Sequence, residues 1–366
     1  MHRVLAQSRR DESTDLATMP GRIQAANNTF ARSICPAIDR EAYAFNVAAL
    51  ETSVRRFLES MITDCALPTM YSRGFQLDEG EDAIGLMESR CVAHDSPTRL
   101  REAMAEDGYL FLHECLDREE VLAARRHILT QLSAEGQLDP AVPLMMGKTK
   151  PGTHLFFQPE LAQKNNPSLQ HLLYARQGNL MSFFSSFLGG EILHFDFTWL
   201  RCISPGLGTP SHCDIVYMGR GTRRLYTAWV PLGDIDFQMG GLMVLENSHK
   251  NARLRATYGR RDVDSYCSNR PNDPARTAAG LNGWLSEDPN QIRRALGGRW
   301  LTAEYKAGDA VIFCMDLVHG GMDNRTDRLR ISSDSRYQLT SEPADERWIG
   351  ENPPGHSAAG KRGRIC

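Results

Sequence analysis

A chain of 366 residues with 41% hydrophobic and 24% charged residues is long enough to bury a sizeable core without disulfide or metal staples. Its formal net charge of -3 provides no basic field for nucleic acid and no polybasic patch for an anionic membrane surface. Composition therefore indicates a globular protein with a small-molecule partner, and it argues against a nucleic-acid-binding or membrane-bound protein.

The nine cysteines are an odd number and include no C-x-x-C pair. This pattern is typical of free thiols in a reducing compartment rather than of a disulfide framework or a zinc site. The first ten residues lack the apolar core of a signal peptide, and no stretch of 18 apolar residues occurs. We expect a cytoplasmic protein, although so short a segment leaves a mitochondrial presequence open.

The chain divides by pattern into three segments. Residues 1–95 combine a helical pattern at 40–61 with polar stretches, and they are predicted to form an extension through which the chain could form a homo-oligomer. Residues 96–345 are the predicted main domain, and residues 346–366 are a predicted flexible tail. No internal repeat of fixed period is present, which excludes a solenoid.

Helical patterns lead the main domain. A helix is expected to open at Thr98, and a short strand follows at 109–113. Asp117 is the predicted N-cap of a second helix, with Glu120 completing a capping box. A further helical region, 168–188, ends at two glycines, which can adopt the left-handed conformation that ends many helices.

After residue 190 the hydrophobic period changes from helical to two. Across 191–204 apolar and polar residues alternate, which is typical of a strand with one buried face. Many short strands after leading helices predict a mainly β protein with flanking helices, an α+β fold whose core is an antiparallel double sheet of the jelly-roll type. The further candidate strands are 224–231, 241–246, 301–305, 309–315 and 329–339.

The segment 251–299 is a long polar insertion between candidate strands, and it carries Tyr258, Tyr266 and Trp284. In a compact domain, connections of this length are usually functional or mobile. We expect a lid over the mouth of the barrel, and a surface excursion without function is the alternative.

Three residues in two segments form a candidate metal site. His212 and Asp214 follow a Gly/Pro turn on an expected strand, where residues two apart point to the same side. His319 ends an apolar strand. Two imidazoles and one carboxylate on one side of a metal leave the other side open, as in non-haem Fe(II) oxygenases. A structural zinc site would need four closed ligands, usually with thiolates.

Arg330 lies eleven residues after His319 and shares one face of an expected strand with Ser332. A guanidinium binds a carboxylate with two parallel hydrogen bonds, and the hydroxyl could add a third donor. The two residues are therefore a candidate clamp for one end of a dicarboxylate. The alternative is that Arg330 pairs with Asp334 on the same strand, or with another acid.

A second H-x-D, His194 to Asp196, precedes the first by eighteen residues, so spacing alone does not decide which pair binds metal. His194 and Asp196 lie inside a regular alternating strand, which predicts a solvated or hydrogen-bonded polar face. His212 and Asp214 follow a turn, where a metal can keep open positions. We therefore predict the His212–Asp214 pair as the ligands.

Residues from about 98 to 340 resemble the phytanoyl-CoA dioxygenase family of 2-oxoglutarate oxygenases. Two departures are Glu246-Asn-Ser-His249, where many members have Pro-Gly-Ser-His, and the first 95 residues, which lie outside the resemblance. The matching motifs, in order, are Asp107-Gly-Tyr-Leu, Pro205-Gly-x-Gly-Thr-Pro before His212-Cys-Asp214, Trp229-Val-Pro-Leu, Gly240-Gly-Leu-Met-Val-Leu-Glu-Asn-Ser-His249, Gly308-Asp before His319-Gly, and Asn324-Arg-x-Asp-Arg-x-Arg330.

The resemblance implies a double-stranded β-helix core of the cupin type, iron held by His212, Asp214 and His319, and 2-oxoglutarate held by Arg330. It also implies that Fe(II), 2-oxoglutarate and O2 oxidise a C–H bond of a small organic substrate, usually by hydroxylation, with release of succinate and CO2. Halogenating relatives have a small residue in place of the carboxylate, so Asp214 favours hydroxylation.

Thr209, Trp229 and Tyr217 are further candidates for contacts with the cosubstrate or substrate, because they flank these motifs. A tryptophan on a barrel strand is more often a core residue.

Two other functions fit the strands, namely a non-oxidative cupin-like metal enzyme and a catalytically inactive barrel that acts as a binding protein. Neither explains the position of Arg330 after His319.

Overall fold

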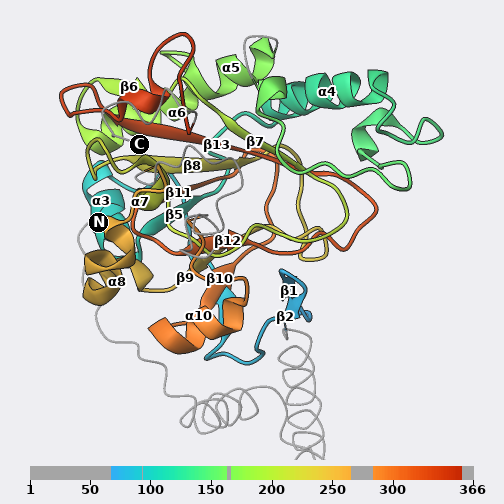
Figure 1. Cartoon of the computed structure of the whole chain (residues 1–366). Helices are drawn as coiled ribbons and strands as arrows, with labels where there is room; N and C mark the ends of the chain where they lie inside the picture. Colours follow the sequence, from blue (N-terminus) through green and yellow to red (C-terminus); the bar gives the residue numbers. More distant parts are fainter. Residues whose placement is uncertain (1–66, 93, 163–165, 265–282, 357–366) are drawn as a thin grey trace, which may run out of the picture. The chain divides into compact units, whose positions relative to one another are not determined.

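The computed structural model describes residues 67–92, 94–162, 166–264 and 283–356, which are coloured in Figure 1. The chain separates into two compact units, Met1–Leu67 and Pro68–Cys366, and the described residues belong almost entirely to the second. The predicted helix at 40–61 lies outside the described residues, and self-association through the extension stays a prediction. No described helix has the length and apolar character needed to cross a membrane.

Two β-sheets form the centre of the second unit. In the larger sheet the strand order is β4-β5-β11-β8-β13-β6, and β7 also pairs with β13. The smaller sheet has the order β12-β9-β10-β3. The larger sheet comprises β4 (Ser89–Arg90), β5 (Tyr109–Leu112), β6 (Ile192–His194), β7 (Trp199–Ile203), β8 (Tyr226–Pro231), β11 (Ala310–Cys314) and β13 (Arg330–Leu339). The smaller comprises β3 (Ile84–Leu86), β9 (Leu242–Leu245), β10 (Trp300–Thr302) and β12 (His319–Gly321).

The two sheets pack face to face, and helices cover the outer face of the larger one (Figure 1). Strand β5 shows why. Its Leu110 and Leu112 belong to the cluster shared with the helices, whereas Tyr109 and Phe111 belong to the cluster between the sheets. The covering helices are α3 (Pro97–Asp107), α4 (Arg118–Ala134), α5 (Pro167–Tyr174) and α6 (Asn179–Leu188).

This arrangement confirms the predicted α+β fold with a jelly-roll core and flanking helices, although the two sheets do not close into a barrel within the described part of the chain. The helix ends follow the predicted chemistry, since the Asp117 carboxylate accepts from the Glu120 backbone N–H at 3.0 Å and Gly189 is left-handed with φ 77°. The predicted helix at 168–188 is two helices, because the chain turns between Ala175 and Gly178.

The prediction of a single strand at 191–204 is wrong, because this segment contains two strands. It is split into β6 and β7, both of which pair with β13. His194 pairs with Tyr337 and Trp199 with Asp334, so two more residues lie on this side than on β13. The extra residues bulge out of the sheet, and the Asp196 N–H donates to the carbonyl of Trp348 instead.

The predicted domain boundary at residue 95 is also wrong, because the compact unit begins at Pro68. Strand β3 pairs in parallel with β10, and β4 pairs in parallel with β5. The short hairpin β1 (Tyr71–Ser72) and β2 (Phe75–Gln76) precedes them. Residues 68–92 therefore belong to the sheet core, and their strands are too short to give a periodic signal.

The flanks of the insertion 251–299 are packed. They form α8 (Ala252–Ala256), a short turn of helix at Tyr258–Arg260 and α10 (Pro289–Leu296). The buried Tyr258 hydroxyl lies between the backbone of Cys213 and Gly283. Residues 265–282 are outside the described part, so the lid stays a prediction.

The tail predicted to be flexible begins with packed residues. Trp348, at the end of a short helical turn (Glu346–Trp348), is 2% exposed and its ring contacts those of Phe197 and Trp199. Arg347 is buried beside Asp345 and Asp264. The main unit therefore continues to at least residue 356, the last that is described.

We predict that Trp348→Ala lowers the free energy of unfolding by about 3–5 kcal/mol, as for other buried tryptophans. Urea unfolding followed by circular dichroism measures the change. The matched control is Phe75→Ala, which removes a ring that is 43% exposed and should change stability by less than about 0.5 kcal/mol. Equal, small changes in the two variants would contradict a packed C-terminal segment.

Candidate metal and cosubstrate site

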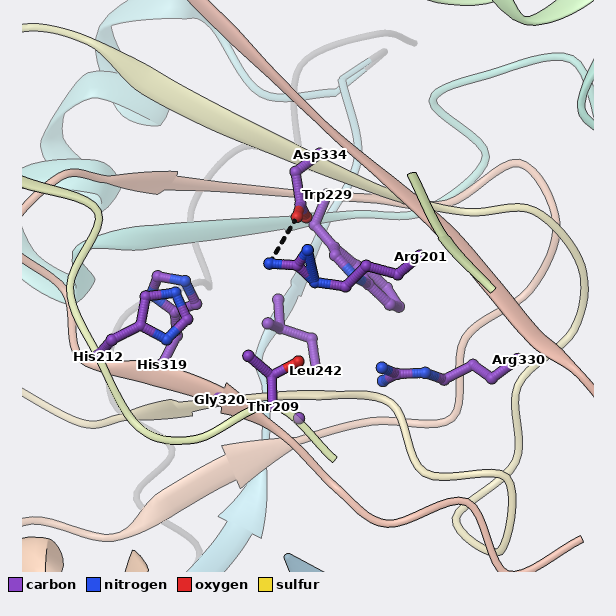
Figure 2. A pocket seen from close by; sticks show the side chains of 10 residues that line it. Arg201, Thr209, His212, Trp229, Leu242, His319, Gly320, Arg330 and Asp334 are labelled. Atoms are coloured by element: carbon purple, nitrogen blue, oxygen red, sulfur yellow. Dashed lines mark ion pairs between the residues drawn. The ribbon is translucent and has the colours of Figure 1, made fainter. Parts of the chain in front are cut away.

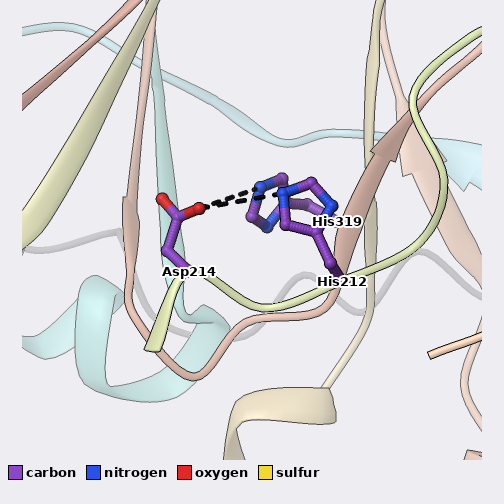
Figure 3. Close-up of side chains that lie close together, drawn as sticks. All are labelled: His212, Asp214 and His319. Carbon is purple, nitrogen blue, oxygen red and sulfur yellow. Dashed lines mark ion pairs between the residues drawn. The ribbon is translucent and has the colours of Figure 1, made fainter. Parts of the chain in front are cut away.

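Backbone pairing brings the two histidines together. The His212 N–H donates to the His319 carbonyl, and the His319 N–H donates to the His212 carbonyl, both at 2.9 Å. The secondary structure at Asp214 differs from the prediction. It is not on a strand but at the start of the short helix α7 (Ile215–Met218), with φ -64° and ψ -26°. The expected strand at 212–214 is wrong, yet the turn into α7 still directs the carboxylate toward both imidazoles (Figure 3).

The three side chains form a compact, buried group. The Asp214 Oδ1 lies 3.8 Å from the His212 Nε2 and 3.7 Å from the His319 Nε2. One ligand atom from each residue lies within 4.8 Å of the other two. Among the described residues, these three form the one cluster of His, Cys, Asp and Glu side chains that could hold a metal ion.

Hydrogen bonds orient both rings. The Nδ1 atom of His212 lies 2.8 Å from the carbonyl of Pro210, and that of His319 lies 3.1 Å from the carbonyl of Leu317. Because a carbonyl only accepts, each Nδ1 must carry the proton, and each Nε2 presents its lone pair to the centre of the group.

The charges of the three groups suit a divalent cation. Burial lowers the pKa of His212 to about 3, with a further contribution from His319, and burial also lowers the pKa of His319. Burial acts to raise the pKa of Asp214, but Arg336 and the two imidazoles outweigh it and leave the pKa below its usual value. Two neutral imidazoles and one carboxylate are a donor set that fits Fe(II).

The second oxygen of Asp214 is already bonded. Its Oδ2 accepts from the Arg336 Nη2 at 2.8 Å and from the Thr227 hydroxyl. The Arg336 guanidinium also lies over the Trp199 ring, 4.0 Å from its centroid. Oδ1 is therefore the oxygen that faces the histidines.

Sequence reasoning missed Arg336 and Thr227. Alternation along β13 places Arg336 on the face of Arg330, which is a signal that could have been used. Thr227 is the cross-strand neighbour of Arg336 on β8.

A cavity with about 300 Å³ of empty space, part of which is open to solvent, extends from the histidines between the two sheets (Figure 2). Arg330 lies at its far end and is 2% exposed. Its lining residues are Arg201, Thr209, His212, Trp229, Leu242, His319, Gly320, Gly321, Arg330 and Asp334.

Arg330 is a buried cation without an acidic partner among the described residues. Its Nη1 donates to the Gly240 carbonyl at 2.8 Å, and its Nε has no partner in the described part. Burial lowers its pKa to about 10, with a contribution from Arg201, so the guanidinium is protonated at neutral pH. The alternative pairing with Asp334 is wrong, because Asp334 lies 3.6 Å from Arg201 instead. A buried charge of this kind favours an anionic ligand.

The remaining sequence candidates divide into two groups. Thr209 and Trp229 line the cavity. Ser332 is buried on the same face of β13 as Arg330, and its hydroxyl has no partner in the described part, but it is not a lining residue. Tyr217 is also outside the lining, and its ring edge packs against His212 with 5.5 Å between centroids. Arg201 and Asp334 line the cavity, and the sequence analysis did not select them as site residues.

The second H-x-D pair lies elsewhere. The His194 ring stacks on Tyr174 at 4.2 Å, and its Nδ1 lies 3.0 Å from the Phe195 carbonyl. The Asp196 Oδ2 accepts from the Gly350 N–H at 2.7 Å. These contacts fit the hydrogen-bonded structural role expected for this pair.

Two histidines and a carboxylate are the ligand set of non-haem Fe(II) oxygenases, and here they lie beside a cavity that ends in a buried arginine. A sequence model described as phytanoyl-CoA dioxygenase matches residues 104–332, more than half of the chain. The chain belongs to the phytanoyl-CoA dioxygenase family. Membership of this family favours an oxygenase that depends on iron, 2-oxoglutarate and O2 over a non-oxidative metal enzyme or an inactive barrel.

Among characterised relatives, the chain is 30% identical over 152 residues to the 1-deoxypentalenic acid 11-beta-hydroxylase of Streptomyces exfoliatus. The match covers 40% of this chain and 52% of that enzyme, so the chain spans about half the length of this relative.

Among solved structures, it is similar to the carbocyclase SnoK from nogalamycin biosynthesis, with a TM-score of 0.46, 18% identity and coverage of 70% of this chain and 89% of that one. It is also similar to EctD from S. alaskensis, with a TM-score of 0.45, 19% identity and coverage of 82% and 92%.

We predict that Asp214→Ala abolishes Fe(II) binding, whereas Asp196→Ala retains it, because only Asp214 faces both histidines. Metal analysis of the two folded variants after anaerobic loading with Fe(II) is the measurement. Iron retained by the Asp214 variant and lost by the Asp196 variant would reverse the assignment.

We also predict that Arg336→Met weakens Fe(II) affinity by about 10–100-fold, since partners of metal ligands typically contribute on this scale. Thr227→Val should also weaken Fe(II) affinity, but by less, because it leaves the ion pair between Arg336 and Asp214 in place. Competition with a chelator gives the affinities. The matched control is Arg328→Met, which alters an arginine on the surface paired with Asp236. The role is disproved if both site variants bind iron as tightly as the control.

Proposed function

We propose that this oxygenase hydroxylates a C–H bond of a small organic substrate and releases succinate and CO2. The observation that carries the proposal is Arg330, a buried cation without an acidic partner in the described residues, at the far end of a cavity that begins at the histidines. 2-Oxoglutarate has a 2-oxo acid at one end and a carboxylate at the other, so its two ends match the two ends of the cavity.

Each residue then has a role. His212, Asp214 and His319 would hold Fe(II) through two Nε2 atoms and Oδ1. Arg330 would bind the distal carboxylate of 2-oxoglutarate in a bidentate manner. Thr209 and Ser332 would add hydroxyl donors, Trp229 would pack along the carbon chain, and Tyr217 would support the His212 ring through their T-shaped contact.

When bound, Fe(II) supplies the redox chemistry by which one oxygen atom of O2 enters succinate and the other enters the substrate. The residues of the chain provide orientation and exclude water. All three proposed ligands are buried, as is Arg330, so water is largely kept from the reacting atoms.

Hydroxylation is favoured over halogenation because the Asp214 carboxylate occupies the ligand position that halogenating relatives leave to halide. The relative from Streptomyces exfoliatus is a hydroxylase by its name, which supports the same outcome.

Five described cysteines are free thiols, which supports the proposal that the protein works in the cytoplasm. These are Cys91, Cys115, Cys202, Cys213 and Cys314.

The proposal is tested by adding Fe(II) and 2-oxoglutarate to the protein without O2 and recording the visible spectrum. A weak charge-transfer band, lost on admission of O2 with formation of equal amounts of succinate and CO2, is the expected result. A protein that binds Fe(II) but shows neither the band nor succinate would contradict the proposal.

We predict that Arg330→Met raises the 2-oxoglutarate concentration at half-saturation by at least about tenfold, because hydrogen bonds to charged groups contribute about 1.5–3 kcal/mol. Fe(II) affinity should be unchanged, since Arg330 does not contact the histidines or Asp214. Half-saturation is measured from the charge-transfer band, with Arg328→Met as the control on the same segment. An unchanged half-saturation in the Arg330 variant removes Arg330 from this role.

A further inference from the structure

A second arginine, Arg201, lines the cavity. It occupies the middle of β7, where its neighbours Leu200 and Cys202 are fully buried toward the helices. Alternation therefore directs Arg201 into the space between the sheets. Figure 2 shows its guanidinium between the histidines and Arg330, and its side chain is 17% exposed.

The contacts of Arg201 leave its donors available. Its guanidinium lies 3.6 Å from the Asp334 Oδ2, which is longer than a hydrogen bond. It also lies 5.9 Å from the centroid of the Phe157 ring. No hydrogen bond from the Arg201 side chain is present within the described residues. A guanidinium in a largely buried cavity gains from an acceptor that is bound in plane with its N–H groups.

The residues that line the cavity carry an excess of positive charge. Two arginines, Arg201 and Arg330, line the cavity, and Asp334 is the carboxylate beside them. The nearby Asp214 is balanced by Arg336. A divalent cation and the doubly charged 2-oxoglutarate cancel each other, so one positive charge remains. With the proposed distal carboxylate on Arg330, Arg201 is the lining cation that can attract a further carboxylate group, because its ion pair with Asp334 is long at 3.6 Å.

Aromatic rings adjoin the same guanidinium on its outer side. Phe157 is 40% exposed and its ring lies 6.5 Å from that of Phe197, which contacts Trp199. An apolar group attached to a carboxylate would find a surface of matching character here.

We propose that Arg201 is a second carboxylate-binding residue of this site, distinct from Arg330. The inference rests on the proposed function. The carboxylate has two conceivable sources, the 1-carboxylate of 2-oxoglutarate or a carboxylate of the substrate that is oxidised. In the second case the substrate class is an organic acid with an apolar body.

The first arm of the test compares binding of 2-oxoglutarate and 2-oxopentanoate, which lacks the distal carboxylate, to the Fe(II)-loaded protein without O2. Arg330→Met should remove the preference for 2-oxoglutarate. If Arg201 binds the 1-carboxylate, Arg201→Met weakens binding of both ligands by at least about tenfold and keeps their ratio. Arg201→Lys should restore part of the affinity, which a purely structural role would not predict.

The second arm adds cyclohexanecarboxylate or its uncharged counterpart cyclohexylmethanol to the protein saturated with Fe(II) and 2-oxoglutarate. If Arg201 binds a carboxylate of the substrate, the acid shifts the charge-transfer band of the wild-type protein at concentrations at least about tenfold below those that affect Arg201→Met. The alcohol should not distinguish the two proteins. Arg328→Met serves as the control in both arms.

The inference is overturned if the Arg201→Met variant binds the ligands of both arms as the control does and has the melting temperature of the wild type. A shift of melting temperature without any change in either binding arm also overturns it, because Arg201 would then only balance Asp334. Failure of the proposed function is distinguishable, since the wild-type protein would then not bind 2-oxoglutarate with Fe(II) at all.

Discussion

The buried ion pair between Arg336 and Asp214 is the interaction on which the rest of the site depends. It joins the start of α7 to β13 of the larger sheet, and Thr227 joins the same carboxylate to β8. Loss of one partner of a buried pair typically costs about 3–5 kcal/mol, because the other charge is left uncompensated. Because Arg336 binds Oδ2, the pair also determines that Oδ1 is the oxygen of Asp214 that faces the histidines.

Strand β13 distributes charge along the site. Its inward residues include Arg330, Asp334 and Arg336, which alternate with residues facing the helices. Arg336 is compensated by Asp214, and Asp334 lies beside Arg201, whereas Arg330 forms no ion pair within the described residues. One strand thus carries a neutralised end beside the metal ligands and an anion-binding end at the far side of the cavity.

Much of this architecture follows from local sequence. Strands such as β8, β11 and β13 were predictable because the Gly, Pro, Asn and Asp clusters that separate short strands are a local property, and the N-cap at Asp117 is a local hydrogen bond. The histidines and Asp214 were predicted together, but through a strand that is absent, because a helix as short as α7 has no periodic signal.

The features that the sequence did not predict depend on distant partners. The bulge between β6 and β7 is stabilised by a backbone bond to Trp348, about 150 residues later in the chain. The pairing of Asp334 with Arg201 rather than Arg330 depends on how neighbouring strands are aligned. The charges of the residues and their spacing in the sequence do not determine which of several arginines Asp334 contacts.

Each histidine ring is oriented by the carbonyl two residues before it, at Pro210 and at Leu317. The orientation of the imidazoles is thus set by the backbone of the folded chain. A preformed N,N,O site of this kind binds first-row divalent metals in the Irving–Williams order, in which Fe(II) ranks below Co(II), Ni(II) and Cu(II). The site offers no soft ligand or closed cage to reverse that order. Because raw affinity ranks Fe(II) below these ions, the relative supply of free ions must contribute to which metal occupies the site in a cell.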